Sequence, residues 1–206
     1  MILPRPLVLD SHSLALAEKH LLAADPLLGE VIKKHGPCTL CESAGEPFAR
    51  LCLSIIGQQL SARAARAIRA RALRRLAVFT PESVLRADEE ALRADGLSRA
   101  KIKYIKALSA MTLREEISFC GLAAMPAEQV IASLVKVPGV GQWTAEMFLI
   151  FQLRHADILS VGDAGLQRAV KKLYGEKYDL GKVGKKWRPY ASVASWYLWR
   201  YLDADI

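Results

Sequence analysis

The chain has 206 residues, which is enough for one substantial core or for two smaller lobes. Hydrophobic residues make up 52% and charged residues 24% of it, a balance that excludes a disordered chain and indicates a globular one. Lysine and arginine number 29 against 21 for aspartate and glutamate, so the net charge is +8. This excess favours a polyanionic partner such as nucleic acid, although charge alone does not establish one.

Targeting and membrane segments are not expected. Pro4 and Pro6 interrupt the N-terminus, which therefore does not resemble a signal peptide. No run of about 18 apolar residues is present, so we expect no membrane span. Four cysteines are too few for a disulfide scaffold. We expect an intracellular protein of the cytoplasm or nucleoid, or of the nucleus in a eukaryote.

Apolar residues recur at helical spacing along most of the chain, and glycine, proline and serine separate the segments. The expected helices, in chain order, are 11–23, 26–35, 47–59, 62–76, two short ones opening at 80–82 and 88–90, 99–113, 127–135, 143–153, 164–174 and 189–202. The pattern predicts an all-α fold in a single domain, 1–206. We expect the terminal segments, about 1–45 and 176–206, to form one lobe, and about 46–175 to form the other.

The turn Pro138-Gly139-Val140-Gly141, between two expected helices, is the most informative segment. Glycine permits positive φ angles and removes the side chain that would block a close approach. Main-chain amides of the turn and of the next helix start can then face a phosphate oxygen. The alternative is a tight connection that uses glycine for its geometry alone.

With Trp143-Thr144-Ala145 after it, this turn resembles the helix-hairpin-helix of the base-excision DNA glycosylases, the HhH-GPD superfamily, in a compact form. The resemblance covers about 47–202 and implies two helical lobes around a cleft. It implies that four hairpin residues contact DNA: Gly139, Gly141, Gln142 and Thr144. It also implies a structural Na⁺ or K⁺ held by three backbone carbonyls, those of Val135, Val137 and Val140.

Asp163 lies twenty positions after Trp143, in a Gly-Asp-x-Gly-Leu context that resembles the DNA-3-methyladenine glycosylase II branch. Breaking the bond between base and deoxyribose builds positive charge on the sugar, which a fixed carboxylate stabilises. N-capping of the helix from Ala164 is the plain structural role, and it is compatible with catalysis. The resemblance implies that Asp163 is the catalytic carboxylate in excision of alkylated bases such as 3-methyladenine and 7-methylguanine.

Two observations favour a monofunctional enzyme. Bifunctional relatives carry a nucleophilic lysine where this chain has Trp143, and an indole cannot form a Schiff base. Those relatives often bind an iron–sulfur cluster through four C-terminal cysteines, whereas this chain has no cysteine after Cys120. We therefore expect hydrolysis by water, with no required cofactor and no iron–sulfur cluster.

Other site residues follow from the same resemblance. Trp143 and Trp199 match positions that face the flipped base, with core packing as the alternative, and Met147 stands where a second aromatic wall is expected. Gln59 matches the side chain that fills the gap left in the duplex, with a polar helix–helix turn as the alternative. The remaining implied DNA contacts are Gln58, Ser61, Ser98, Lys103 and Lys171.

A single Cys38-x-x-Cys41 pair is weak evidence for zinc, and we interpret it as packing. The expected partner is double-stranded DNA that contains alkylated bases, bound by a monomer. Two alternatives remain open: a helix-hairpin-helix module that binds DNA structure without chemistry, and a glycosylase for another lesion class such as mismatched or oxidised bases.

Overall fold

The computed structural model describes residues 6–42 and 45–203. The interpretation of Pro4 and the outermost parts of the expected terminal lobe lie outside the described residues. Within these ranges the chain is helical, apart from one isolated antiparallel bridge between Val8 and His155. The predicted all-α fold is therefore confirmed. None of the described helices has the length and apolar character needed to cross a membrane.

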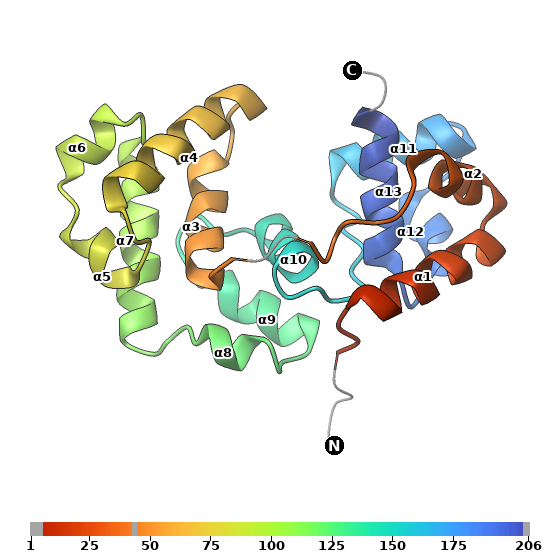
Figure 1. Ribbon diagram of the computed structural model, residues 1–206, viewed down its shortest axis with the longest axis horizontal. Coiled ribbons are helices and arrows are strands. Elements are labelled where there is room, and N and C mark those ends of the chain that lie inside the picture. The colour runs from red at the N-terminus through yellow and green to blue at the C-terminus, as the bar shows by residue number, and fades with distance from the viewer. Residues whose placement is uncertain (1–5, 43–44, 204–206) are drawn as a thin grey trace. The chain divides into compact units, whose positions relative to one another are not determined.

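The chain divides into two compact units, which we call the middle unit (residues 45–145) and the terminal unit (residues 1–44 and 146–206). Figure 1 labels their helices. The middle unit contains α3 (Pro47–Gly57), α4 (Ala62–Leu76), α5 (Pro81–Arg86), α6 (Glu89–Ala94), α7 (Arg99–Leu113), α8 (Phe119–Leu122) and α9 (Ala127–Leu134). The terminal unit contains α1 (Ser11–Ala24), α2 (Pro26–His35), α11 (Ala164–Tyr174), α12 (Leu180–Val183), the 3₁₀ helix η1 (Gly184–Trp187) and α13 (Ala191–Asp203). One further helix, α10 (Gln142–Phe151), begins in the middle unit and continues into the terminal unit.

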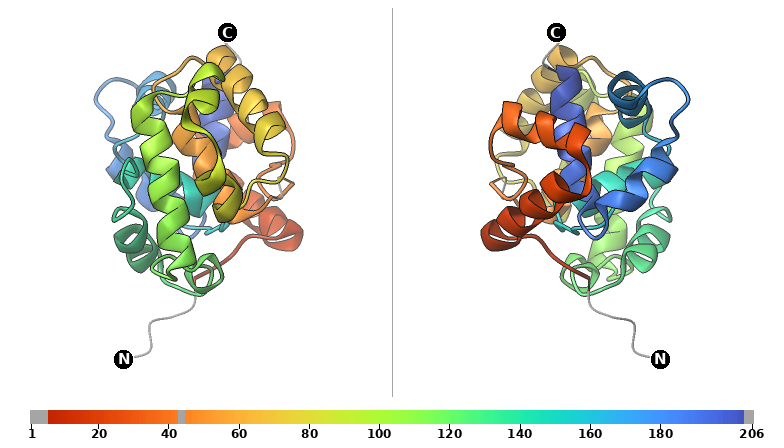
Figure 2. Two further views of the ribbon diagram at one scale, coloured as in Figure 1. Left: turned by 90° about the vertical axis from the view of Figure 1, so that its left-hand side faces the viewer. Right: turned by 90° about the vertical axis from the view of Figure 1, so that its right-hand side faces the viewer.

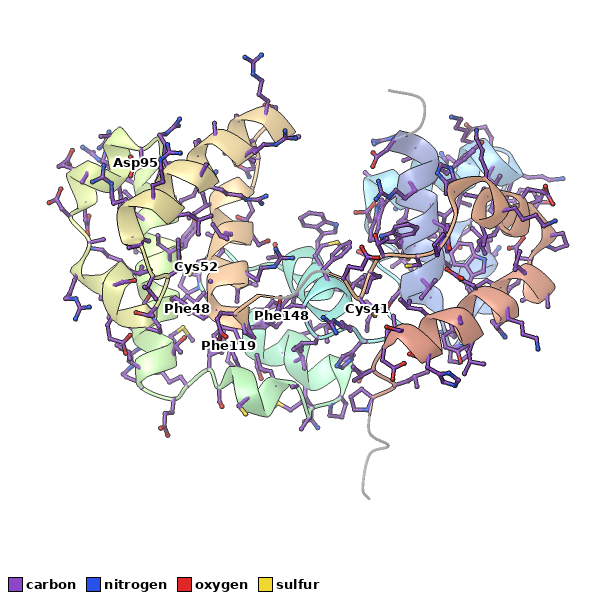
Figure 3. All side chains as sticks on the ribbon, in the orientation of Figure 1. Cys41, Phe48, Cys52, Asp95, Phe119 and Phe148 are labelled. Carbon is purple, nitrogen blue, oxygen red and sulfur yellow. The ribbon has the colours of Figure 1, made fainter. Side chains whose placement is uncertain are left out.

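In the middle unit, α7 is the central helix and packs against α3, α5 and α6 (Figure 2, left). Its apolar face is fully buried at Ile105 and Leu108, as is Ile55 of α3. The rings of Phe48 and Phe119, labelled in Figure 3, meet edge to face at 6.2 Å in the same unit. Burial of these side chains holds the helices that support the hairpin.

In the terminal unit, α13 packs against α1, α2 and α11 (Figure 2, right). Asp25 is almost completely buried and accepts hydrogen bonds from Tyr174 Oη at 2.8 Å and from Trp187 Nε1 at 3.0 Å. Its other oxygen caps α2 through the amide of Leu28. This buried carboxylate therefore ties α2 to α11 and η1.

Several boundaries differ from those that the sequence predicts. The predicted lobes divide near residue 175, whereas residues 146–175 lie in the terminal unit, because α11 packs on α13 and α2. The last helix begins at Ala191 and not at Pro189, whose peptide bond to Arg188 is cis. Three short elements were not predicted, because four residues carry too little periodicity to detect: α8, α12 and η1.

Candidate active site

The expected hairpin is present between α9 and α10 in the middle unit. The amide of Val140 donates to the carbonyl of Val137 at 3.0 Å, which closes a tight turn around Gly139. Gly139 has a φ of +82°, a conformation that other residues adopt only with strain. The amide of Ala145 then donates to Gly141 at 3.1 Å and begins α10.

The two glycines of the hairpin have different structural roles. A Cβ at Gly139 would lie 2.2 Å from Cδ2 of Tyr104, so this glycine is required by packing against α7. A Cβ at Gly141 would meet no atom within 4 Å, and Gly141 and Gln142 are both exposed. Gly141 therefore leaves open main chain that a ligand can approach closely.

Thr144 and Gln58, both expected to contact DNA, are bound to each other. Nε2 of Gln58 donates to Oγ1 of Thr144 at 3.1 Å and to the carbonyl of Gly139 at 3.0 Å. The side chain of Thr144 is 4% exposed, which gives a ligand little access to it. The structure thus brings these two residues together, and their polar side-chain groups bind each other and the hairpin main chain.

The turn between α3 and α4 presents two side chains to solvent. Gln59 is exposed and has a φ of +56°, and the next residue, Leu60, is 37% exposed. Ser61 follows and caps α4 by accepting from the amide of Ala64 at 3.3 Å. An apolar side chain at such a tip is suited to contact base faces, and the sequence reasoning overlooked Leu60.

Three other residues expected to contact DNA can be located individually. Ser98 caps α7 through the amide of Lys101 at 3.3 Å, and Lys103 is exposed on the first turns of that helix. Lys171, on α11 in the terminal unit, is half-exposed and lies 3.4 Å from the carboxylate of Glu176. Both lysines are thus open to solvent.

The three residues whose carbonyls are expected to hold a monovalent cation belong to the hairpin and its flanks. Val137 and Val140 are buried and Val135 is 43% exposed. The Val137 carbonyl accepts one hydrogen bond, and its second lone pair leaves capacity for a further ligand. Neutral carbonyl oxygens are hard donors, so the chemistry of this set fits Na⁺ or K⁺.

Asp163 is the N-cap of α11 in the terminal unit and is 7% exposed. Its Oδ1 accepts from the amide of Leu166 at 2.7 Å and from Nε1 of Trp199 at 3.2 Å. Its own amide donates to Ser160 at 3.0 Å. The capping role is therefore real, and it leaves the carboxylate in a fixed orientation in a largely dry environment.

Trp199 is placed beside Asp163 by the absence of a side chain at Gly165. A Cβ there would lie 3.0 Å from Oδ1 of Asp163 and 3.5 Å from the Trp199 ring. The Trp199 ring also lies 5.6 Å from that of Phe151, tilted by 31°. The Gly-Asp-x-Gly pattern thus has a geometric explanation that the sequence alone did not supply.

A second buried carboxylate was not predicted. Glu146 is 7% exposed, and the fully buried hydroxyl of Ser160 donates to its Oε2. Glu146 is not among the site residues expected from the sequence. The carbonyl of Ser160 accepts a hydrogen bond from the amide of Asp163, and its hydroxyl donates to Glu146. Ser160 therefore links the two carboxylate residues.

The remaining expected pocket residues lie on α10. Trp143 is 48% exposed, the expected state of a stacking surface rather than of a core residue. Met147 is partly buried one turn later.

In the loop after α2, Cys38 is buried, and burial raises the pKa of its thiol to about 12. Across the described ranges, no group of three or more histidine, cysteine, aspartate or glutamate residues is arranged to bind a metal.

Comparison with known families decides the assignment of this fold. A model of the HhH-GPD superfamily of base excision DNA repair proteins matches residues 52–186, which is more than half of the chain. The chain belongs to this superfamily. The family expected from the hairpin and Asp163 is therefore confirmed.

Two curated relatives from Schizosaccharomyces pombe match along nearly their whole lengths. The alkylbase DNA glycosidase-like protein mag2 is 31% identical over 195 residues, covering 89% of this chain and 92% of the relative. DNA-3-methyladenine glycosylase 1 is 31% identical over 200 residues, covering 91% of this chain and 87% of the relative.

Solved structures show the same similarity. A DNA-3-methyladenine glycosidase from Bacillus halodurans superposes with a TM-score of 0.79 at 39% identity, covering 96% of this chain and 92% of that one. A 3-methyladenine DNA glycosylase from S. pombe, in complex with abasic DNA, gives a TM-score of 0.79 at 28% identity, covering 90% and 95%. The helix-hairpin-helix glycosylase fold is thereby confirmed.

Proposed function

We propose that this HhH-GPD protein is a monofunctional DNA glycosylase that removes alkylated bases, with Asp163 as its catalytic carboxylate. The observation that carries the proposal is the environment of Asp163, which is nearly buried and fixed by two donors on one oxygen. A structural N-cap requires only the bond from Leu166, so the bond from Trp199 is what sets Asp163 apart from an ordinary cap.

The geometry supports a charge-stabilising role. Cleavage of the N-glycosidic bond builds positive charge on the deoxyribose, and a carboxylate already oriented needs no reorganisation to stabilise it. Burial strengthens this interaction because little water screens it. The same carboxylate can orient or deprotonate the water that attacks the sugar, which leaves an abasic site and a free base.

Alkylated purines are the substrate class that the comparisons favour. Relatives at about 30% identity over most of their lengths are named DNA-3-methyladenine glycosylases. Alkylated purines such as 3-methyladenine carry positive charge and leave readily, so a strong second acid is not required for them. The exposed indole of Trp143 offers an aromatic face that attracts a cationic base.

DNA binding is assigned to the hairpin and to the turn after α3. The exposed main chain at Gly141 can approach a phosphate, and we extend the proposal to a Na⁺ or K⁺ held by Val135, Val137 and Val140. Such an ion would supply positive charge at the phosphate when bound. The carbonyls themselves fix the turn, and the predicted DNA contacts read backbone rather than base sequence. We expect a monomer acting on double-stranded DNA.

The test is release of free base from duplex DNA methylated with dimethyl sulfate, measured by chromatography together with the integrity of the strand. We expect 3-methyladenine or 7-methylguanine to appear while the abasic strand stays uncut until it is treated with alkali. Strand cleavage without alkali would contradict the monofunctional reaction. DNA binding without release of any base from methylated, deaminated or oxidised duplexes would favour the non-catalytic module.

A further inference from the structure

The turn after α3 and the hairpin before α10 are joined by one side chain. Nε2 of Gln58 lies 3.0 Å from the Gly139 carbonyl and 3.1 Å from Thr144 Oγ1. A carbonyl oxygen only accepts, so the amide nitrogen and not the oxygen of Gln58 must face Gly139. Both N–H groups of the amide are thereby used within the protein, and neither remains for a phosphate or a base.

The main chain of Gln58 is held as well. Nζ of Lys101, on α7, donates to the Gln58 carbonyl at 2.7 Å and to the Ile56 carbonyl at 2.9 Å. These are carbonyls at the C-terminal end of α3, where a cation is favoured. Burial lowers the pKa of Lys101, and the nearby Arg69 guanidinium lowers it further. Lys101 is therefore partly withdrawn from water, as expected of a structural rather than a phosphate-binding cation.

The helix α7 supports the hairpin from the same side. Tyr104 follows Lys101 by three residues, so both lie on one face of α7. The Tyr104 ring packs where a side chain at Gly139 would be. One helix face thus holds the turn through Lys101 and the hairpin through Tyr104, and Gln58 links the turn to the hairpin directly.

The link lies next to a strained residue. Gln59, the following residue, has a φ of +56°, a conformation that persists only where neighbouring contacts determine it. Fixing Gln58 on both its side chain and its carbonyl supplies those contacts. Gln59 and Leu60 are consequently presented at a defined place on the middle unit.

We propose that Gln58 and Thr144 are positioning residues that lock the 58–61 turn to the hairpin, so that both engage DNA as one rigid element. Insertion of the turn into the duplex would then occur in register with the hairpin's hold on the backbone. This inference rests on the proposed function for its kinetic readout. It replaces the direct DNA contacts that the sequence suggested for these two residues.

The test is a double-mutant cycle with Gln58→Met and Thr144→Val, which keep side-chain size but remove the hydrogen bond. Single-turnover excision of 7-methylguanine is measured in two duplexes. In one the lesion is paired with cytosine, and in the other it lies opposite an abasic site. Opening the paired site costs more, so we expect about a tenfold loss there and less than about a threefold loss opposite the abasic site. The double variant should be no slower than the slower single variant.

Two further variants act as controls. Thr144→Ser keeps the hydroxyl and should retain the wild-type rate, whereas a purely steric role of Thr144 would slow Thr144→Ser and spare Thr144→Val, which keeps the side-chain size. Gln129→Met changes an exposed glutamine of α9 in the same unit and should change neither rate. Equal losses of excision rate in the two duplexes, or additive losses in the double variant, would overturn the proposal. If Gln58→Met does not fold, the comparison of Thr144→Val with Thr144→Ser tests the proposal by itself.

A readout independent of excision separates this inference from the proposed function. The wild type and the variants are bound to a duplex with an abasic site next to 2-aminopurine, whose fluorescence rises when it is unstacked. We expect Gln58→Met and Thr144→Val to give the same reduced signal at saturation. An unchanged signal would overturn the positioning role, whether or not the wild type releases a base.

Discussion

The two units present different kinds of chemical group. The hairpin of the middle unit exposes the main chain at Gly141 and the cationic side chain of Lys136. In the terminal unit, the carboxylates of Asp163 and Glu146 are both 7% exposed and held by hydrogen bonds. Solvent-exposed main-chain amides can bind a phosphate. A carboxylate stabilises a developing positive charge most strongly when it is shielded from water. Binding and chemistry should therefore be separable by mutation.

The largest effect expected in the middle unit is that of Gly139→Ala. A methyl group would collide with Tyr104 and would be forced to a positive φ, so we expect a loss of about 2–4 kcal/mol in the free energy of unfolding. Gly141→Ala is the matched control, because its methyl group meets nothing within 4 Å. Urea unfolding measures both, and equal losses would show that Gly139 is not held by packing.

Trp199→Phe tests the terminal unit in the same way. It removes the indole donor to Asp163 and keeps an aromatic ring beside Phe151. We expect single-turnover excision to fall about tenfold, since the oriented carboxylate loses its indole donor. Trp196→Phe, in the buried face of α13, should leave the rate within about twofold. A wild-type rate for Trp199→Phe would mean that this donor is not needed.

Ser160→Ala should affect stability more than rate. It takes one donor from the buried Glu146, which costs about 1–3 kcal/mol in the free energy of unfolding. Ser195→Ala is a matched change in the same unit, because that buried hydroxyl donates only to the Ala191 carbonyl one turn earlier. Thermal unfolding measures the stability of both variants. Equally small losses in the two would show that the hydrogen bond to Glu146 makes no special contribution.

The smallest effect is expected for Lys171→Gln. If this half-exposed lysine contacts a phosphate, the variant should lower the slope of log binding constant against log salt concentration by about one. Lys185→Gln removes the same charge from an exposed position on η1 and should leave the slope unchanged. Fluorescence anisotropy at several salt concentrations measures both slopes, and identical values would exclude a specific contact by Lys171.

Local sequence signals predicted the helices well where a cap residue stands at the start. The helix Ala62–Leu76 has the bounds expected from Ser61, and Ala164–Tyr174 those expected from Asp163. The hairpin and the catalytic candidate were also found from the sequence, because both depend on contiguous residues. Short helices and the boundary between the lobes were not, since neither leaves a periodic signal within one segment.

Contacts between distant residues could not be predicted. Gln58 and Thr144 are more than eighty positions apart, and only folding shows that their polar groups bond to each other. Burial of Glu146 was likewise invisible, because a glutamate on an apolar helix looks solvated until its partner Ser160 is known. The sequence therefore located the candidate site, while the contacts that surround it depend on tertiary packing.

The most direct test of this account measures DNA binding and single-turnover excision for two variants, Asp163→Asn and Gly141→Ala. Asparagine is a good N-cap, and its side-chain oxygen can accept from Leu166 and Trp199, so the variant removes the negative charge with little change in shape. We expect Asp163→Asn to bind methylated duplex normally and to excise at least about 100-fold more slowly. Gly141→Ala should bind about tenfold more weakly yet excise within about threefold of the wild-type rate at saturating enzyme. Loss of binding and excision together in both variants, or a wild-type excision rate for Asp163→Asn, would contradict the account.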